Sequence, residues 1–574
     1  MHIIHINNIT VNYDGRVIFK ELSWVIDSAA RVGLIGHNGA GKSSLLKVIA
    51  GVYQPDAGSM VKQRGVSVGY LPQQVELTPG RTLIEEAMIL PPKLAEIDMA
   101  LNAVEHRLSD PGVYNDPDQL TRALGEQERL LEQYERLGGS QHAGKVRSIL
   151  AHFGFKSADY DLPTDGLSGG QKKLVQFTRL AAEQPDMLLL DEPDNHLDLE
   201  SKRRLEIFLR DYPGGVVIVS HDRYLLDEVV TRIVEMEEGK LTEYKGNYTQ
   251  YALERELARL RQQQMYVAQQ KRVAQVEAAI KRFELAAAAD LSERHARQAR
   301  SRRKMLERWE ANGELVERVT ERRQLELEFA GSRGSTKALE AKRLSMAFDD
   351  DPVFFDLDLL VRHGERVGLV GKNGSGKSVL FKLILGELTP LSGEVKIGNS
   401  TKVGYYAQEH QTLHAWYERT PIEFIRDVSP SSEGDAVAFL ISFLFTYSQT
   451  RQPIGTLSGG ERSRLQIAAL MLQRPNLLLL DEPTNNLDIQ SSEALETALE
   501  DFEGAVFVIS HDRYFLDRVV DRVVELEDGG LRSFEGGYTD YLSKKNQPPP
   551  VIVEPKGKEK SATQRREGAK TPRR

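Results

Sequence analysis

Cysteine is absent from the 574 residues of the sequence. This absence excludes disulfides, iron–sulfur clusters, cysteine-ligated zinc and a cysteine nucleophile together. Long apolar runs are missing as well: the longest candidate, 436–445, has about half of the roughly 18–20 residues that a membrane helix needs and is interrupted by Ser442. The first residues lack the regions of a signal peptide, so we expect a cytoplasmic protein.

A large excess of charge of one sign is also absent. Lys and Arg number 75 against 84 Asp and Glu, which gives a formal net charge of −9. This mildly acidic balance argues against a wholly basic nucleic-acid-binding protein, although it leaves room for local basic patches. With 40% hydrophobic and 28% charged residues, the chain has the composition of a protein that folds around cores, and its length predicts several domains.

The same motifs occur twice in the chain. Residues 36–43 (Gly-His-Asn-Gly-Ala-Gly-Lys-Ser) and a segment ending at Gln73 recur 335 residues later, at 371–378 and at Gln408. Leu-Ser-Gly-Gly, Asp-Glu-Pro and Ser-His-Asp each recur 290 residues later. Constant order and spacing predict two homologous domains. The offsets differ by 45 residues, which places an insertion of that length in the first copy, within a charged helical stretch at about 94–139.

Composition divides the rest of the chain. We expect the first domain at 1–245 and the second at 336–545. Between them, 246–335 is rich in Arg, Gln, Ala, Leu and Glu and has no proline, which predicts long helices. Asp-Leu-Ser at 290–292 offers a turn, so this linker would run out and back as a hairpin. The tail, 546–574, has three consecutive prolines and few apolar residues, and is predicted to be a basic disordered segment.

Both glycine-rich segments follow short apolar strands and open predicted helices, which is the context of a phosphate-binding P-loop. Their glycines let backbone N–H groups surround an anion, and the helix N-terminus adds a favourable dipole. The lysines are predicted to contact the β- and γ-phosphates, and the serines that follow them to bind Mg²⁺. The predicted phosphate-binding positions are Gly36, Asn38, Gly39, Gly41, Lys42, Ser43 and Ser44 in the first copy, and Gly371, Asn373, Gly374, Gly376, Lys377 and Ser378 in the second.

Two further motifs follow apolar strands in each copy. Asp-Glu-Pro places Asp191 and Asp481 at the carboxyl ends of strands, where open α/β sheets bind ligands, and we expect both to hold Mg²⁺. The next residues, Glu192 and Glu482, are predicted to orient or deprotonate the attacking water. Ser-His-Asp-Arg-Tyr follows another strand in each copy, and its histidines, His221 and His511, are predicted to sense the γ-phosphate.

Together these motifs resemble the ATP-binding cassette superfamily. The resemblance implies an α/β fold of two P-loop cassette domains joined by the helical hairpin. In that superfamily two cassettes meet head to tail, and each ATP lies between one P-loop and the other cassette's Ser-Gly-Gly. Ser458, Gly459 and Gly460 would then complete the first site, and Ser168, Gly169 and Gly170 the second. The resemblance also implies Mg²⁺ contacts for Gln73 and Gln408 and adenine stacking for Tyr13 and Phe348.

Most cassette ATPases drive membrane transport, but a transporter energy subunit fits poorly, because no membrane span is present and a helical linker joins two cassettes on one chain. The arrangement is similar to the ABC-F family of tandem cassettes that bind ribosomes. Residues 191–198 and 481–488 are close to that family's Asp-Glu-Pro-Thr-Asn-His-Leu-Asp. They depart from it at Asp194 and at Asn486. Asp194 adds a carboxylate near Glu192, which would slow hydrolysis by charge repulsion.

The linker has a concentrated positive charge. Between 291 and 308, only Glu293 and Glu307 oppose seven basic residues: Arg294, Arg297, Arg300, Arg302, Arg303, Lys304 and Arg308. A solvated helix face is the plain alternative, but on a projecting hairpin this charge favours contact with RNA phosphates. In ABC-F proteins the linker reaches tRNA and rRNA, and the insertion corresponds to an arm that contacts the ribosome. The mixed charge of the insertion also fits a simple enlargement of a helical subdomain.

These observations predict an ATPase, with ATP and Mg²⁺ as cofactors, that binds the ribosome in its ATP-closed state, modulates translation and leaves on hydrolysis. Because both halves of each site lie on one chain, we expect a monomer. Two alternatives remain. One is a DNA-directed cassette ATPase of repair or recombination, favoured if the basic segments bind branched DNA better than ribosomes. The other is an antibiotic-resistance factor of the same family, a subgroup that tends to have a shorter arm and a longer linker.

Overall fold

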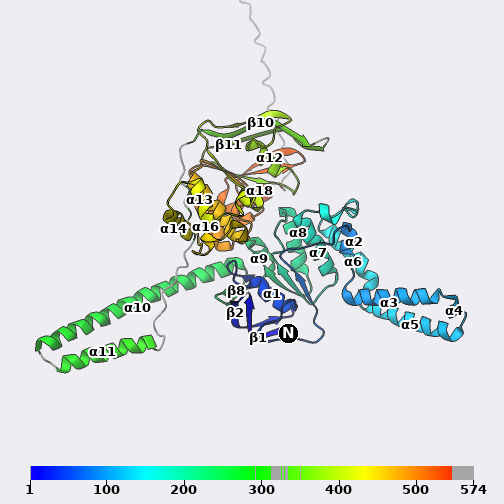
Figure 1. The fold of residues 1–574 in the computed structure, drawn as a ribbon, viewed down its shortest axis with the longest axis horizontal. Helices are drawn as coiled ribbons and strands as arrows, with labels where there is room; N and C mark the ends of the chain where they lie inside the picture. The colour runs from blue at the N-terminus through cyan, green and yellow to red at the C-terminus, as the bar shows by residue number, and fades with distance from the viewer. Residues whose placement is uncertain are drawn as a thin grey trace, which may run out of the picture.

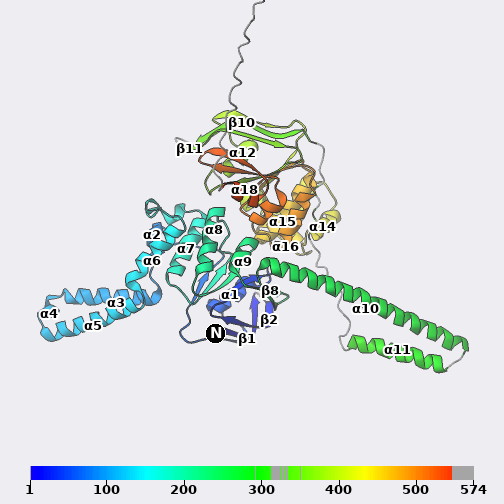
Figure 2. The ribbon, with the colours of Figure 1, turned by 180° about the vertical axis from the view of Figure 1, so that it is seen from behind.

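The computed structural model describes residues 2–13, 15–290, 293–311, 334–348 and 351–545, together with Leu325, Leu327 and Phe329. Two similar α/β bodies, the first and second cassettes, lie against each other (Figure 1). Two helical projections leave the first cassette in opposite directions, and the view from behind shows the same arrangement (Figure 2). The predicted fold class is confirmed. The basic tail lies outside the described residues.

The first cassette has two sheets and a set of covering helices. A six-stranded sheet is parallel except for its last strand, and a three-stranded sheet is antiparallel. In spatial order the large sheet is β5 (Val68–Leu71), β6 (Met187–Asp191), β7 (Gly215–Val219), β3 (Arg31–Ile35), β8 (Arg232–Glu237) and β9 (Lys240–Lys245), and the small sheet is β2 (Arg16–Asp27), β1 (His2–Tyr13) and β4 (Ala57–Lys62). The helices are α1 (Lys42–Ala50), α2 (Leu83–Ala87), α6 (Gly139–His152), α7 (Gly169–Ala182), α8 (Leu199–Asp211) and α9 (Arg223–Val229).

The second cassette repeats this topology. In spatial order its large sheet is β14 (Val403–Tyr406), β15 (Leu477–Asp481), β16 (Ala505–Ile509), β12 (Arg366–Val370), β17 (Arg522–Glu527) and β18 (Gly530–Glu535). Its small sheet is β11 (Asp351–Arg362), β10 (Lys337–Phe348) and β13 (Ser392–Ile397). Its helices are α12 (Lys377–Ile384), α13 (Pro421–Val428), α14 (Glu433–Ser442), α15 (Gly459–Gln473), α16 (Ile489–Glu500), α17 (Arg513–Val519) and α18 (Tyr538–Lys545).

The central strands explain where the cores lie. Every residue of β6, β7, β15 and β16 is buried, as continuous apolar strands of a parallel sheet require when both faces are covered. In the first cassette one face packs on α1 and the small sheet, and the other face packs on α2 and α6 to α9. This leaves the carboxyl ends of the strands, where the loops carry the predicted site residues, facing the second cassette.

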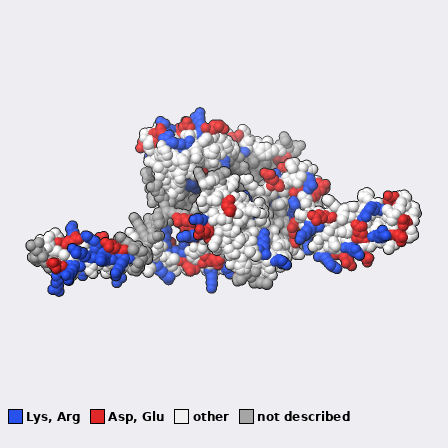
Figure 3. Space-filling model, turned by 60° about the horizontal axis from the view of Figure 1, so that its bottom comes forward, with Lys and Arg blue, Asp and Glu red and all other residues white. Residues whose placement is uncertain are grey.

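The insertion and the linker form the two projections. The insertion at about 94–139 is built from α3 (Pro92–Leu108), α4 (Pro111–Tyr114) and α5 (Pro117–Arg136). The linker contains α10 (Tyr248–Asp290), whose 43 residues span about 64 Å, and α11 (Glu293–Ala311), which folds back along it. Figure 3 shows Lys and Arg side chains gathered on the α10–α11 hairpin, at the left, whereas both charge signs mix on the α3–α5 arm.

Packing holds the hairpin together and anchors the linker's far end. The guanidinium of Arg302 lies 4.7 Å from the ring centroid of Phe283, and Arg303 bonds Glu284 at 2.5 Å, so these two basic residues join α11 to α10. Beyond the hairpin, Leu325 and Phe329 are buried in the core of the second cassette, with the ring of Phe329 5.9 Å from that of Phe502. The linker is therefore fixed to both cassettes.

Candidate active sites

Each predicted P-loop lies between a buried strand and a helix whose first residue is the predicted lysine. Gly41 precedes α1 with φ 102°, and Gly376 precedes α12 with φ 98°, in the left-handed region that favours glycine. A Cβ at Gly41 would lie 2.5 Å from Cγ2 of Ile18. Neither helix has a side-chain cap. The N-termini of both helices therefore present backbone N–H groups and a positive dipole to an anion.

The P-loop lysines are curled over their own loops. Nζ of Lys42 donates to the carbonyl oxygens of Gly36 at 2.7 Å and His37 at 3.0 Å. Nζ of Lys377 donates to the carbonyl oxygens of Gly371 and Lys372, both at 2.8 Å. Burial lowers the pKa of both lysines. A triphosphate in the loop would supply the negative charge that a buried ammonium group lacks.

A serine and an aspartate meet behind each P-loop. The hydroxyl of Ser43 acts on the carboxylate of Asp191 and favours its ionised form, and Oγ of Ser378 donates to Oδ2 of Asp481 at 3.3 Å. Oδ1 of Asp191 is buried and has no hydrogen-bond partner among the described residues. Burial raises the pKa of Asp191, and that of Asp481 to about 6. An unpartnered carboxylate oxygen beside a hydroxyl is a donor set that fits Mg²⁺.

The predicted catalytic glutamates adopt a strained backbone. Glu192 has φ 50° and Glu482 has φ 51°, in a region that costs a non-glycine residue energy and that is frequent at functional sites. Each peptide N–H is held by the neighbouring strand, from Glu192 to Val219 at 2.8 Å and from Glu482 to Ile509 at 2.9 Å. Each carboxylate therefore belongs to a strained residue that directly follows the strand carrying the aspartate, and a backbone hydrogen bond to the next strand holds that residue in place.

The two glutamates have different partners. Oε2 of Glu192 accepts from Nε2 of Gln73 at 2.8 Å and from Nδ2 of Asn195 at 2.5 Å. Oε2 of Glu482 instead accepts from the backbone N–H of His511 at 3.3 Å. Burial, together with the charge of Asp481, raises the pKa of Glu482 to about 8. The two sites therefore differ in the groups that hold the predicted catalytic glutamate.

Each histidine lies beside the glutamate of its own cassette. Nε2 of His221 is 3.9 Å from Oε1 of Glu192, and Nε2 of His511 is 3.5 Å from Oε1 of Glu482. Burial and the charge of Lys42 lower the pKa of His221 to about 3, and burial together with Lys377 lowers that of His511. Both rings are therefore neutral near pH 7, which suits a hydrogen bond to a phosphate oxygen.

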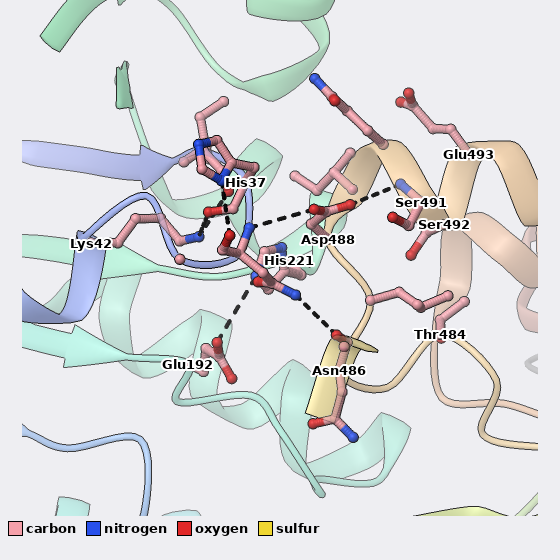
Figure 4. A pocket seen from close by; sticks show the side chains of 18 of the residues that line it. His37, Lys42, Glu192, His221, Thr484, Asn486, Asp488, Ser491, Ser492 and Glu493 are labelled. Carbon is pink, nitrogen blue, oxygen red and sulfur yellow. Dashed lines mark hydrogen bonds and ion pairs between the residues drawn. The ribbon is translucent and has the colours of Figure 1, made fainter. Parts of the chain in front are cut away.

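Residues of the second cassette close the first site. A cavity of about 1930 Å³ is lined by the first P-loop, Glu192 and His221 and, from the other side, by Ser458, Gly459 and Gly460. A Cβ at Gly460 would lie 2.8 Å from Nδ2 of Asn38, so the two loops touch. Asn38 also donates from Nδ2 to the carbonyl oxygen of Asn486 at 3.0 Å and from its N–H to Asp488 at 3.4 Å. Figure 4 shows Asn486 and Asp488 facing Lys42 and His221.

The second site repeats these contacts with the cassettes exchanged. Asn373 donates from Nδ2 to the carbonyl oxygen of His196 at 3.1 Å and from its N–H to Oδ2 of Asp198 at 3.2 Å. Gly170 is packed on the same segment, since a Cβ there would lie 2.5 Å from the carbonyl oxygen of His196. Because the bond to Asn38 uses the backbone oxygen of Asn486, the departure from histidine at that position preserves the contact between cassettes.

Four residues of these sites were not assigned roles from the sequence. Asp198 and Asp488 bind the P-loop of the opposite cassette, Asn195 holds Glu192, and Nζ of Lys173 donates to the carbonyl oxygen of Glu192 at 2.7 Å. The aspartates recur 290 residues apart at the end of the Asp-Glu-Pro segments, and this recurrence was the available signal.

The remaining predicted residues lie in varied surroundings. Tyr13 and Phe348 end β1 and β10 with 65% and 46% of their surface exposed, so neither is a core residue, and adenine stacking stays a prediction for both. The side chain of Gln408 is outside the described residues. Asp194 is buried and accepts a hydrogen bond from Oγ of Ser220 at 2.7 Å, and the positive charge of Lys202 acts on its carboxylate.

Two P-loop domains that face each other across their strand ends define the class of ATP-binding cassette ATPases. Among the residues that the structure describes, no helix is long and apolar enough to cross a membrane. One family model, described as ABC transporter, matches residues 19–195 and 354–485, and a second with the same description matches 234–329.

Named relatives cover almost the whole chain. It is 35% identical to the energy-dependent translational throttle protein EttA of Escherichia coli K12 over 535 residues, 92% of each chain. It is 33% identical to ABC transporter F family member 5 of Arabidopsis thaliana, over 94% of this chain and 77% of that protein. An archaeal ribosome recycling factor, aABCE1, has a similar fold, with a TM-score of 0.58 and 20% identity over 94% of this chain and 92% of that one. The chain belongs to the ABC-F family, and its cassettes are those of an ATPase.

Proposed function

We propose that this ATPase binds the ribosome while ATP holds its cassettes together, modulates translation in that state, and leaves after hydrolysis. The name of its 35%-identical relative, a translational throttle, supports the assignment to translation. The ribosome as partner would place the protein in the cytoplasm. The corresponding domains are the cassettes at 1–245 and 336–545, the linker at 246–335 and a basic tail at 546–574.

The observation that carries the proposal is the attachment of α10 to both cassettes at its first turn. The hydroxyl of Tyr248 donates to Oε1 of Glu493 in the second cassette at 3.3 Å. The next residue, Thr249, bonds Asp227 of the first cassette through its N–H at 2.8 Å and its hydroxyl at 2.7 Å. Asp227 also accepts from Tyr514 of the second cassette at 3.4 Å. Cassette closure would therefore set the direction of the whole hairpin.

The chemistry assigned to each site follows from its own residues. The P-loop and its lysine would hold the β- and γ-phosphates, while the neutral histidine would donate to a γ-phosphate oxygen. The strained glutamate, in its ionised form, would take a proton from the attacking water, since phosphoryl transfer depends mostly on positioning and charge neutralisation. Ser43 and Asp191, or Ser378 and Asp481, would hold Mg²⁺, which neutralises phosphate charge when bound.

Closure draws on contacts from both cassettes. The Ser-Gly-Gly loop of one cassette would reach the phosphates held by the P-loop of the other, so ATP favours the closed state by its differential affinity for it. Loss of the γ-phosphate removes part of that affinity, and the cassettes would separate. The hairpin would then lose the orientation that fits the ribosome.

The hairpin's charge supports RNA as the surface that it meets. The side chains of Arg294, Arg297, Arg300, Lys304 and Arg308 are exposed on α11, whereas Arg302 stacks on Phe283 and Arg303 pairs with Glu284. We assign phosphate contact to the exposed set. Such contacts are sequence-independent and steeply dependent on salt. The mixed charge of the α3–α5 arm supports a second, less electrostatic contact.

Sedimentation with purified ribosomes tests the proposal. The Glu192→Gln, Glu482→Gln protein should pellet with ribosomes when ATP is present and stay in the supernatant without it, whereas wild type with ATP should be largely released. A double variant that never pellets with ribosomes would contradict the proposal. ATP-dependent binding to branched DNA in place of ribosomes would favour the DNA-directed alternative.

Salt dependence tests the hairpin. The Arg294→Ala, Arg300→Ala, Lys304→Ala variant should bind ribosomes more weakly, and the slope of log K against log salt should fall by about 3, roughly one unit for each lost phosphate contact. Its ATPase rate without ribosomes should not change. The matched control removes three exposed basic residues of the first cassette, Lys20, Arg210 and Lys240, and should keep the slope. An equal loss of slope in the control would refute the assignment.

A further inference from the structure

The two cassettes differ at one position of the segment that follows Asp-Glu and at one position of the helix after it. Alignment at the offset of 290 pairs Lys202 of α8 with Ser492 of α16, and Asp194 with Thr484. The first cassette thus carries a cation and an anion where the second carries two hydroxyl groups. The side chain of Lys202 is 11% exposed and Asp194 is 4% exposed. A buried charge at one position requires a counter-charge nearby.

Lys202 reaches across the interface between the cassettes. Its Nζ lies 2.9 Å from Oδ2 of Asp222 in its own cassette and donates to the carbonyl oxygen of His511 in the other at 3.0 Å. The charges of Asp222 and Asp194 favour the protonated amine and raise the pKa of Lys202. Serine at the equivalent position, 492, ends at Oγ, several bonds short of the point that a lysine ammonium reaches. The first cassette alone has a side chain of this length there.

The segment that Lys202 holds belongs to the second site. The carbonyl of His511 accepts from Lys202, and its N–H donates to Oε2 of Glu482 at 3.3 Å. The ring nitrogen Nε2 of His511 is 3.5 Å from Oε1 of Glu482. In the first site the matching distance, from His221 to Glu192, is 3.9 Å, and Glu192 is held by Gln73 and Asn195 instead. In the second site, therefore, the glutamate is bonded to the backbone of the histidine, and the same backbone is bonded to Lys202 of the first cassette.

We propose that Lys202 is a positioning residue that acts across the interface on the second ATP site. Its ammonium fixes the backbone of His511, which fixes Glu482, so full hydrolysis at the second site requires the first cassette to be docked. Asp222 is the paired carboxylate of this lysine, and Asp194 adds the second negative charge that the other cassette lacks at the matching position. The first site lacks the equivalent hydrogen bond from the opposite cassette, because the residue that faces it at the matching position is Ser492. The inference concerns the ATPase cycle and holds whatever partner the hairpin contacts.

Single-site backgrounds test the proposal. Glu192→Gln leaves only the second site able to hydrolyse, and Glu482→Gln leaves only the first. Adding Lys202→Ser should lower kcat at the second site about tenfold with KM unchanged, which is the effect of one charge-assisted hydrogen bond lost near the reacting groups. The first site should change by less than about twofold, since its glutamate has other partners. Arg203→Ser, the exposed neighbour on α8, controls for net charge and should change neither.

A second variant separates positioning from folding. Lys202→Ser alone removes the positive charge that acts on Asp194, while Asp222 keeps Arg513 at 3.5 Å, and should lower the melting temperature. Asp194→Thr with Lys202→Ser copies Thr484 and Ser492 and should recover the melting temperature while the second site stays about tenfold slow, as the loss of one charge-assisted hydrogen bond predicts. Recovery of the rate together with the melting temperature would overturn the proposal. Equal slowing of both sites by Lys202→Ser would overturn it too.

Discussion

The Glu192→Gln, Glu482→Gln protein is expected to hydrolyse ATP at less than about one hundredth of the wild-type rate, because each site loses the group that we propose takes a proton from water. The amide is close in shape to the carboxylate, and both positions keep the strained backbone held by Val219 and Ile509. ATP binding should therefore persist. Phosphate release under multiple-turnover conditions and nucleotide binding by filter assay measure the two quantities separately.

The control is Glu200→Gln, a carboxylate in the interface whose side chain is half exposed and pairs with Arg204 and Lys372. It should leave the hydrolysis rate within about twofold of wild type, as expected of an exposed ion pair. If the double variant keeps a tenth of the wild-type rate or more, the glutamates are not the groups that activate water, and the assignment of the catalytic residues fails.

Arg513→Ala is expected to weaken closure by about 3–5 kcal/mol, the cost of leaving a buried charge without its partner. Arg513 of the second cassette bonds the carboxylate of Glu206 in the first, with both side chains buried. The mirror residue Arg223 pairs across the interface with Glu496. Oε2 of Glu496, however, is also 3.0 Å from Nη1 of Arg518, which lies on α17 of the same cassette. Arg223→Ala should therefore cost less, because Glu496 keeps a cation.

The measurement is the distance between labels on the two cassettes as ATP is titrated, with closure reported by energy transfer. The ATP needed for half-closure should rise far more for Arg513→Ala than for Arg223→Ala. Removing Glu206 together with Arg513 should recover part of the loss, since no buried charge is then stranded. Equal losses for the two arginine variants would show that Arg518 does not compensate.

Local pattern was sufficient for much of this molecule. The repeat offsets predicted two homologous domains. Apolar runs predicted strands, and the run at 187–190 lies in the buried parallel strand β6. The composition of the linker and its lack of proline predicted long helices within 246–335, and α10 spans Tyr248–Asp290. These properties follow from residue type and spacing along a short stretch of chain, so the sequence alone carries them.

The family resemblance supplied a different kind of information. Pairing Ser458 with the P-loop of the opposite cassette came from known cassettes, since two motifs more than 400 residues apart carry no sign of their contact. The structure places Gly460 against Asn38. The role of Asp198 and Asp488 escaped notice because a short acidic residue before a helix is also an ordinary N-cap, which both of them are.

The sequence by itself determined which chemical groups are present, in what order, and on which helices and strands. Only the tertiary structure decided that Lys202 donates a hydrogen bond to His511. It also decided that Arg302 stacks on Phe283 while Arg300 is exposed. The different hydrogen-bond partners of Glu192 and Glu482 were likewise set by the tertiary structure. The reason is physical: a contact between cassettes depends on how two rigid bodies dock. Docking sums many weak surface interactions that no single segment of the chain encodes.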